Sequence, residues 1–228
     1  MTTQMSILSQ IGPALWRLFQ PGDYRRRYGD TYKPHSVDYR QNRRLVRSGI
    51  APAKTRRIAA LVPGDTIVDV GAGEGILALE LAAVKARVRA IDITPRRHRT
   101  AQKLQQTWAG LGRKVDNCEM ILGDAVVDPS LMDGFDTLIA SHVIYYFRDQ
   151  IDPFLAEAAK RVRFVCLVGN ATRNRRYAGG RTPFDIGEYI IYSTPQGMRA
   201  LMERHGFEIV EVADVGDPVV IGKRIEAD

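Results

Sequence analysis

The sequence predicts a doubly wound α/β fold, in which helices cover both faces of a mostly parallel sheet that ends in an antiparallel hairpin. Three observations predict it. From residue 66 onward, short apolar runs alternate with longer amphipathic stretches, which is typical of a βαβ series. The first apolar run leads into a glycine-rich loop directly before a helical stretch. The last two apolar runs, 207–213 and 218–223, are joined by a short turn that contains Gly216 and Asp217, which indicates a hairpin.

The individual elements follow from apolar periodicity and from residues typical of helix ends. Five apolar runs are expected to form the parallel strands: Thr66–Val70, Val88–Ile91, Cys118–Leu122, Phe135–Ala140 and Phe164–Gly169. Four amphipathic stretches are expected to form helices: Gly75–Lys85, Pro95 to about Gly110, Gln150–Val162 and Thr194–His205. Thr94 is expected to cap the second of these helices, and Gly206 to end the fourth.

The first 51 residues are expected to form a basic N-terminal arm or helical cap, and residues 52–228 the main domain. Residues 7–19 place apolar side chains on one helical face, which either docks on the domain or lies on a membrane surface. Residues 21–51 are rich in Arg, Tyr, Gly and Pro without a clean period, so an irregular, partly helical segment is expected. A helix is expected from Pro52 to Val62.

Positive charge is concentrated near the N-terminus. Twelve Lys or Arg residues and three Asp or Glu residues lie between Arg17 and Arg57, which gives this segment a charge of +9, whereas the whole chain carries +7. A basic patch attracts phosphates, carboxylates, nucleic acid or a lipid surface. The alternative is a solvated basic surface that only keeps the protein soluble.

Composition argues against several protein classes. The length of 228 residues suits one domain, or one domain with an appendage. No uninterrupted apolar run reaches about 18 residues, so no transmembrane helix is expected, and the first ten residues do not resemble a signal peptide. Cys118 and Cys166 lack the spacing of metal ligands, so no metal site is expected. Cys166 lies in an apolar run and is expected to be buried, which favours a reducing, cytoplasmic compartment.

The glycine-rich loop predicts a nucleotide-cofactor site. Gly71, Gly73 and Gly75 remove Cβ atoms where the backbone turns sharply and approaches a ligand, and the following helix offers free N–H groups. The G-x-G-x-x-G order of dinucleotide sites would need a glycine where Ile76 stands, which argues against an NAD-dependent oxidoreductase. Asp92 ends the second strand, where a carboxylate can accept hydrogen bonds from ribose hydroxyls or, alternatively, cap a helix.

Four motifs resemble, in the correct order, those of class I S-adenosylmethionine-dependent methyltransferases. The stretch 68–75 resembles the first motif, and Ala90-Ile91-Asp92 resembles the second, whose acidic residue binds the ribose. Gly123-Asp124-Ala125 resembles the third, whose aspartate binds the adenine amino group. Residues 135–142 resemble the fourth strand and the loop beside the methionine moiety.

This resemblance covers about residues 52–224 and implies a Rossmann-like fold with a seven-stranded sheet and an antiparallel last hairpin. It also implies S-adenosyl-L-methionine as the cofactor and methylation as the reaction. The residues expected at the cofactor are Asp69, Gly71, Ala72, Gly73, Gly75, Asp92, Ile93, Asp124, Ala125 and Ser141.

The loop after the fourth strand, residues 141–147, argues against two classes of methyltransferase. Enzymes of this family that methylate exocyclic amino groups of bases typically carry an Asn-Pro-Pro-Tyr type motif there, and this chain does not. The loop also contains no cysteine, which argues against a cytosine methyltransferase with a cysteine nucleophile.

Methyl transfer from a sulfonium needs mainly positioning and desolvation, and a base is required only when the acceptor is protonated. His142 is the first candidate base because it follows the fourth strand at the carboxyl edge of the sheet, and Tyr145 is the second. A structural role for His142 is the alternative. His35 is a weaker candidate, and His98 is expected on a helix face exposed to water.

Two segments are expected to form the acceptor site: the basic arm, and residues 170–177 directly after the fifth strand. The side chains expected to contact the acceptor are Arg25, Arg26, Tyr28, Tyr146, Arg173 and Arg176. Arginine suits bidentate contacts with phosphate or carboxylate, so a small or medium-sized anionic acceptor is favoured, phosphorylated, carboxylated or sugar-containing. The alternative for 170–177 is an ordinary polar loop.

Two other functions stay open. The tyrosines and arginines of the arm suit phosphate contacts and base stacking, so RNA is an alternative acceptor. A non-catalytic binding protein that kept the fold is less favoured, because the glycines and Asp92 are intact.

Overall fold

The computed structural model describes residues 36–178 and 187–226. The predicted helix 7–19, most of the basic arm and His35 lie outside these residues, as do the expected acceptor residues Arg25, Arg26 and Tyr28. Arg176 lies in a described helix, but its side chain is outside the described part of the protein.

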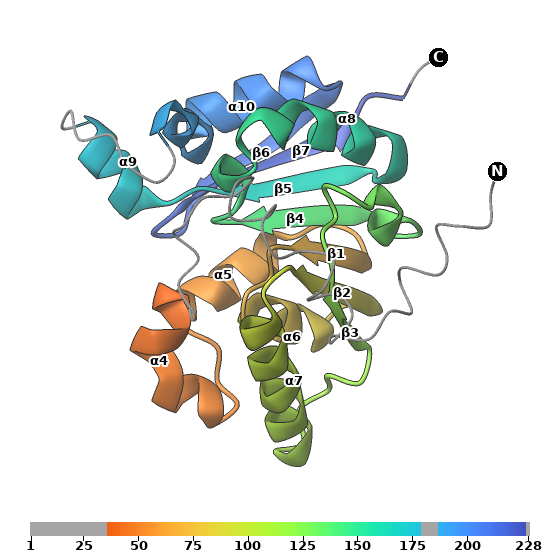
Figure 1. The fold of residues 1–228 in the computed structure, drawn as a ribbon, viewed down its shortest axis with the longest axis vertical. Coiled ribbons are helices and arrows are strands. Elements are labelled where there is room, and N and C mark those ends of the chain that lie inside the picture. Colours follow the sequence, from red (N-terminus) through yellow and green to blue (C-terminus); the bar gives the residue numbers. More distant parts are fainter. Residues whose placement is uncertain (1–35, 179–186, 227–228) are drawn as a thin grey trace.

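Among the described residues, a seven-stranded sheet forms the centre of the molecule, as the resemblance implies (Figure 1). Its strands are β1 (Thr66–Val70), β2 (Arg87–Asp92), β3 (Cys118–Leu122), β4 (Thr137–Ser141), β5 (Phe164–Val168), β6 (Phe207–Asp214) and β7 (Pro218–Arg224). They lie in the order β3-β2-β1-β4-β5-β7-β6, and the first five in this order pair in parallel. The parallel series predicted from alternating apolar runs is therefore confirmed.

Helices connect the strands. The α-helices are α4 (Val37–Arg47), α5 (Ala53–Leu61), α6 (Ile76–Ala82), α7 (Pro95–Gly110), α8 (Ile151–Arg161), α9 (Ala171–Ala178) and α10 (Pro195–Arg204). Short 3₁₀ helices are η1 (Pro129–Met132), η2 (Ile144–Tyr146), η3 (Arg148–Gln150) and η4 (Gly187–Ser193). Within the described ranges, every helix is too short or too polar to cross a membrane.

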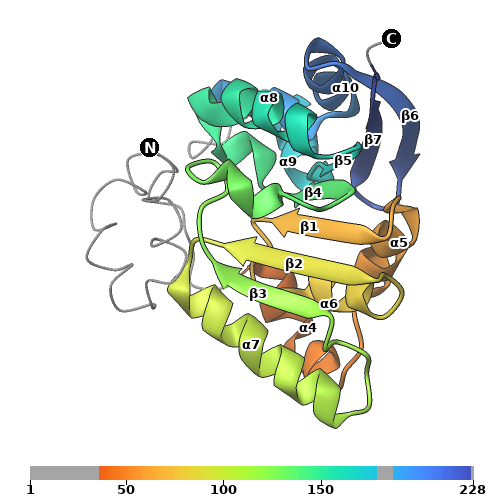
Figure 2. The ribbon, with the colours of Figure 1, turned by 90° about the vertical axis from the view of Figure 1, so that its right-hand side faces the viewer.

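Helices cover both faces of the sheet, so the predicted doubly wound fold is confirmed (Figures 1 and 2). Side chains alternate along each strand: Ile67 and Val68 of β1 belong to two different buried cores. The core around Val68 also contains side chains of α8 and α10. The core around Ile67 contains side chains of α4, α5, α6 and α7.

The C-terminal hairpin is confirmed, and its two strands lie in the sheet in the reverse of their sequence order. β7 runs antiparallel between β5 and β6, with Val168 opposite Val219. The antiparallel strand therefore lies one position inside the sheet, and β6 forms the edge. This insertion brings the turn 215–217 to the carboxyl end of β5.

The described end of the predicted arm packs on the main domain as a helix. Ser36 caps α4, because its Oγ accepts a hydrogen bond from Tyr39 N at 3.1 Å. Tyr39 and Val46 are buried in the same core as α5, α6 and α7. Trp108 Nε1 in α7 donates a hydrogen bond to Val46 O at 2.7 Å, so a buried indole N–H holds α4 on α7.

Two local expectations and one alternative are corrected. The segment after β5 is not an ordinary polar loop but helix α9, which Asn170 caps by accepting a hydrogen bond from Arg173 N at 3.0 Å. Thr94 precedes α7, but its hydroxyl makes no capping bond; Asp92 Oδ1 instead accepts from Thr94 N at 2.7 Å. His98 is only 8% exposed, because its face of α7 packs inward, and this burial lowers the pKa of its imidazole.

Candidate active site

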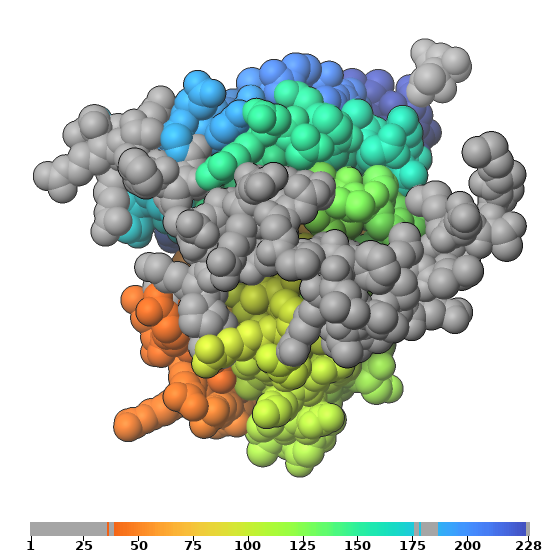
Figure 3. Space-filling view, viewed as in Figure 1, coloured from red at the N-terminus to blue at the C-terminus, as the bar shows by residue number. Residues whose placement is uncertain are grey.

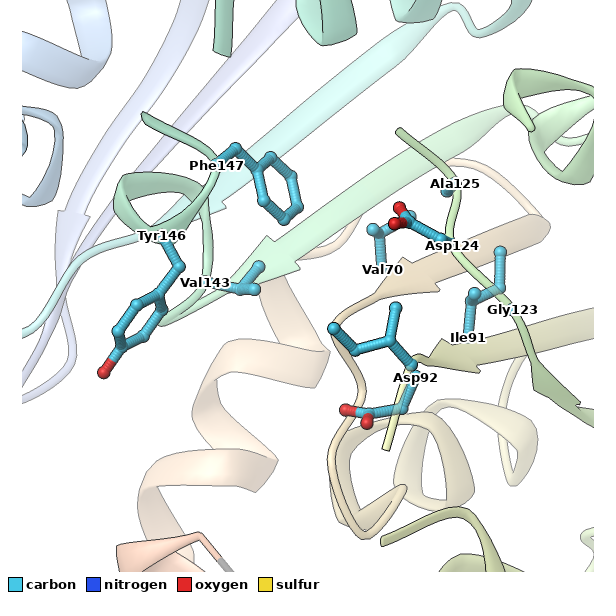
Figure 4. Close-up of a pocket in the computed structure, with 11 residues that line it drawn as sticks. Val70, Ile91, Asp92, Gly123, Asp124, Ala125, Val143, Tyr146 and Phe147 are labelled. Atoms are coloured by element: carbon cyan, nitrogen blue, oxygen red, sulfur yellow. The ribbon is translucent and has the colours of Figure 1, made fainter. Parts of the chain in front are cut away.

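A pocket opens at the carboxyl ends of β1, β2 and β3, beside the loop after β4 (Figure 4). Six of the predicted site residues line it: Gly71, Asp92, Ile93, Asp124, Ala125 and Tyr146. Val143 and Phe147 line it from the loop after β4. Residues that are far apart in the sequence thus meet at one edge of the sheet, as expected for the carboxyl ends of parallel strands.

Five other predicted cofactor residues lie near the pocket but are not part of its lining: Asp69, Ala72, Gly73, Gly75 and Ser141. Asp69 is buried in β1, and Ser141 is half-buried at the end of β4. Gly75 caps α6, and a Cβ there would lie 3.1 Å from Met120 and 3.2 Å from Ala101. Gly75 therefore suits both the left-handed backbone at this cap, with a φ of +72°, and the close packing at the start of α6.

The glycine-rich loop is fixed by backbone hydrogen bonds to the end of β2. Gly71 N and Ala72 N both donate to Ile91 O, at 2.8 and 3.0 Å. Gly71 and Gly73 both have positive φ, +75° and +61°. A Cβ on Gly71 would lie 2.5 Å from Val143 Cγ2, whereas a Cβ on Gly73 would meet no atom within 4 Å. Gly71 thus allows the loop after β4 to approach, and Gly73 leaves open space.

Alanine at these two positions is expected to destabilise the protein by different amounts. Both substitutions force a left-handed backbone on a residue with a Cβ, at a cost of roughly 1–2 kcal/mol each. Gly71→Ala also overlaps Val143, and such overpacking costs about 1–3 kcal/mol more. Denaturant unfolding of the two variants measures this difference, and equal stabilities would contradict the close contact at Gly71.

Two buried carboxylates lie at the ends of β1 and β2. Asp92 Oδ2 accepts a hydrogen bond from Gly73 N at 2.9 Å, and Oδ1 accepts from Thr94 N, so the carboxylate orders both loops. Burial raises the pKa of Asp92, although the positive charge of Arg97 and these hydrogen bonds oppose the rise. Burial, and next the nearby Asp92, raise the pKa of Asp69 to about 7.

Asp124 occupies the corresponding position after β3. It is 4% exposed, and its Oδ1 accepts a hydrogen bond from Val126 N at 3.0 Å. This bond holds the turn that also carries Ala125, so the third predicted motif forms one ordered part of the pocket wall (Figure 4).

Glu74 links the glycine-rich loop to α4, which sequence reasoning missed. Its Oε1 accepts a hydrogen bond from Ser36 N at 2.9 Å, and its Oε2 accepts from Ser36 Oγ at 2.6 Å. Since Ser36 also caps α4, one buried carboxylate holds both the loop and the start of the helix. The two residues are 38 positions apart, and no periodic pattern relates them.

His142 lies at the carboxyl edge of the sheet as predicted, next to Val143 of the pocket lining. Its partner, Asp217, was missed: His142 Nε2 lies 2.9 Å from Asp217 Oδ2. Lys54 Nζ lies 2.6 Å from the same oxygen. The His142 side chain is 21% exposed and that of Asp217 only 6%. The imidazole is therefore accessible, while the carboxylate beside it is buried.

Tyr146 and Arg173, both predicted at the acceptor, are brought together. Arg173 Nη2 donates a hydrogen bond to Tyr146 Oη at 2.6 Å, and its guanidinium lies over the rings of Tyr145 and Tyr146, 5.5 and 5.4 Å from their centroids. Tyr145, the second candidate base, is 1% exposed. Burial raises the pKa of its hydroxyl above the ordinary value.

A family model described as "Methyltransferase domain" matches residues 39–212. Among solved structures, the chain is similar to a magnesium protoporphyrin IX methyltransferase from Synechocystis with bound SAM, at 18% identity and a TM-score of 0.56 over 96% of each chain. It is also similar to a SAM-dependent methyltransferase from Aquifex aeolicus, at 17% identity and a TM-score of 0.58 over 86% of this chain and all of that one. These likenesses show the fold.

Curated relatives match over shorter stretches. Ribosomal RNA small subunit methyltransferase A of Moorella thermoacetica is 39% identical over 87 residues, which are 38% of this chain and 26% of the relative. Ubiquinone biosynthesis O-methyltransferase of Methylocella silvestris is 29% identical over 135 residues, 59% of this chain and 50% of the relative. The matches thus span a quarter and a half of these relatives.

Proposed function

The chain belongs to the family of class I S-adenosylmethionine-dependent methyltransferase domains, and from this premise we propose that it methylates a hydroxyl oxygen on a small or medium-sized anionic molecule. The observation that carries the proposal is the pair of His142 and Asp217 at the carboxyl edge of the sheet. A hydroxyl must lose its proton as the new bond forms, and a positioned imidazole can take it. A carboxylate acceptor would need no such base.

The residues that line the pocket suit S-adenosylmethionine. Asp92 and Asp124 stand at the ends of neighbouring strands, where the family's acidic residues accept hydrogen bonds from the ribose and the adenine amino group (Figure 4). Ile93 and Val143 provide apolar walls, and the missing side chain of Gly73 leaves room beside the loop. When bound, the cofactor supplies a methyl group on a positively charged sulfur.

Asp92→Ala is expected to weaken the binding of S-adenosylmethionine by roughly 5- to 150-fold, because a ligand donor left unpaired costs about 1–3 kcal/mol. Calorimetric titration measures the affinity for S-adenosylmethionine. NAD serves as the negative-control ligand and is expected not to bind. Asp128→Ala is a matched control: this carboxylate also accepts a backbone hydrogen bond, from Ser130 N at 3.2 Å, but lies outside the pocket lining. Parental affinity in a folded Asp92→Ala protein would place the cofactor elsewhere.

We assign proton transfer to His142 and a shaping role to Tyr145. The buried hydroxyl of Tyr145 is a poor base at neutral pH, because its ionised form is disfavoured by burial. His142 is partly exposed and follows directly on β4, beside the pocket. Desolvation and alignment of the acceptor supply the remainder of the catalysis.

Arg173 supports an anionic acceptor. Its guanidinium is held by the Tyr146 hydroxyl beside the pocket, and the start of α9 lies at the same edge of the sheet. Arg25, Arg26, Tyr28 and Arg176 remain proposed contacts. Two similar proteins are named for small-molecule acceptors, a ubiquinone biosynthesis O-methyltransferase and a magnesium protoporphyrin IX methyltransferase, which is consistent with this class. Cys118 and Cys166 are free and buried, which supports the proposed cytoplasmic setting.

RNA is the second candidate acceptor, and one surface favours it. Helices α4 and α7 lie against each other, as their coloured surfaces in Figure 3 show. Their exposed basic side chains are Arg40, Arg43, Arg44, Arg47, Arg96, Arg99 and Lys103. Within the described part of the chain, no carboxylate forms an ion pair with any of them. A similar protein is also named as a ribosomal RNA methyltransferase.

A labelling experiment tests the proposal. The protein is incubated with S-adenosylmethionine carrying a tritiated methyl group and with panels of hydroxylated acids, carboxylic acids without hydroxyls, and RNA. An ether product keeps its label in alkali, whereas a methyl ester releases labelled methanol. Alkali-stable label in a small hydroxylated acid is expected. Ribonuclease-sensitive label, with binding that falls steeply with salt, would establish the RNA alternative instead.

A further inference from the structure

Asp217 joins three elements that surround the carboxyl edge of the sheet. Its Oδ2 lies 2.9 Å from Nε2 of His142, in the loop after β4. The same oxygen lies 2.6 Å from Nζ of Lys54, in α5. Its Oδ1 accepts a hydrogen bond from Ala171 N at 2.9 Å, at the first residue of α9. Asp217 itself lies in the turn between β6 and β7 and is 4% exposed. One buried carboxylate thus holds the candidate base, a helix start and a lysine together.

The charge state of Asp217 fixes the tautomer of His142. Burial alone would raise the pKa of Asp217, but the hydrogen bond and charge attraction of His142, together with the hydrogen bonds from Lys54 and Ala171 N, outweigh it and lower that pKa to about 2. An ionised carboxylate only accepts hydrogen bonds, so the neutral imidazole must present Nε2–H to it. Nδ1 is then the ring nitrogen that carries the lone pair.

The backbone of His142 is also held in an uncommon conformation. Its φ is +58°, in the left-handed region, and His142 N donates a hydrogen bond to Val168 O at 2.9 Å. Such backbone persists only where the surroundings over-determine it. The contacts with Val168 and Asp217 together fix both the main chain and the ring.

We infer that Asp217 is a positioning residue for methyl transfer: it holds His142 with Nδ1 as the proton-accepting atom, and Lys54 anchors the carboxylate that does so. This inference rests on the proposed function, in which His142 accepts the proton of the acceptor hydroxyl. Beyond that function, the inference names the ring nitrogen that accepts the proton. It also gives roles to Asp217 and Lys54, which no sequence motif indicates.

The first test needs no acceptor. The full chain is labelled with ¹⁵N in its histidine rings, and His142→Gln identifies the His142 resonances among those of the four histidines. At the high-pH limit of a titration, the nitrogen shifts report which ring nitrogen carries the proton. Nε2–H is expected in the parent, and this preference should be lost in Asp217→Asn. A parent ring protonated at Nδ1, or a tautomer unchanged in Asp217→Asn, overturns the inference.

Asp214→Asn is the matched control. Asp214 ends β6, three residues before Asp217, and its Oδ1 accepts a hydrogen bond from Gly216 N at 2.8 Å. This variant removes a carboxylate from the same hairpin without touching His142, so the parental tautomer is expected. Should Asp217→Asn fail to fold, the spectrum of the parent still decides the tautomer.

The second test uses the labelling assay with the acceptor it identifies. Asp217→Asn is expected to lower kcat by about 10-fold or more with little change in cofactor Kd. In the His142→Gln background it should cause no further loss, because groups that act as a unit are not additive. A further loss would give Asp217 a separate role. If His142→Gln keeps the parental kcat, His142 is not the base and the proposed function is refuted. If His142→Gln loses activity but Asp217→Asn keeps the parental kcat, only the positioning role of Asp217 is refuted.

Discussion

Replacing His142 with Gln is expected to lower kcat by about 10²- to 10⁴-fold, the range that a positioned general base contributes. Glutamine retains a polar side chain but cannot accept a proton at neutral pH. Cofactor affinity should stay near the parental value, because most of the proposed cofactor contacts come from the ends of β1, β2 and β3 and the His142 side chain is not part of the pocket lining. Steady-state kinetics with the identified acceptor, together with calorimetric titration of S-adenosylmethionine, measure the two effects separately.

His205 provides a matched control for this substitution. Its Nε2 lies 2.8 Å from Asp152 Oδ1, so it is also a histidine beside a carboxylate. It follows α10, which packs on one face of the sheet, and it is not part of the pocket lining. His205→Gln should therefore keep the parental kcat. A normal kcat in His142→Gln would instead favour an acceptor that is already ionised, such as a carboxylate.

Asp69→Asn is expected to abolish a pH dependence of stability that amounts to about 4 kcal/mol. The pKa of Asp69 is about 7 in the folded protein, against the ordinary value of 3.8. Between these values the folded state holds a proton that the unfolded state has released, so stability falls as pH rises from about 4 to about 7. Each pH unit in this window contributes about 1.4 kcal/mol.

Denaturant unfolding at several pH values measures this effect as a difference between parent and variant. Below pH 4 and above pH 7 the difference should be constant, and between them it should change steadily in favour of Asp69→Asn. Asp136→Asn is a control in which the stability difference from the parent should change in the opposite direction with pH. Hydrogen bonds from Asp65 N and Thr66 lower the pKa of Asp136, so its carboxylate stabilises the parent as pH rises. Parallel curves for Asp69→Asn and the parent would mean that Asp69 ionises normally in the fold.

Local sequence patterns predict much of the fold and the residues of the proposed cofactor pocket. Strands β4 and β5 are nearly continuous apolar runs, because both faces of a parallel sheet are buried at its centre, whereas β2 and β3 are apolar runs interrupted by Arg or Glu. Asp92 ends β2 and Asp124 follows β3 by two residues, so both are predictable, because parallel strands end at a common edge. These inferences need only the order of elements along the chain.

The proposed proton-transfer site depends on contacts between distant residues, which no local sequence pattern contains. His142 and Asp217 are 75 positions apart, and they meet only because β7 inserts between β5 and β6. Helix α9 has no apolar stripe, so periodicity could not predict it. Asn170 before this segment was a capping signature that could have indicated it.

The insertion of β7 has a consequence for how the protein is made. While the ribosome is still synthesising the residues before 218, β5 has an open edge and His142 lacks its carboxylate partner. An unpaired strand edge is a template for association with other chains. The nascent chain thus gains a protected strand edge and the His142–Asp217 contact of the proposed proton-accepting site in the same step, when residues 217–224 take their place.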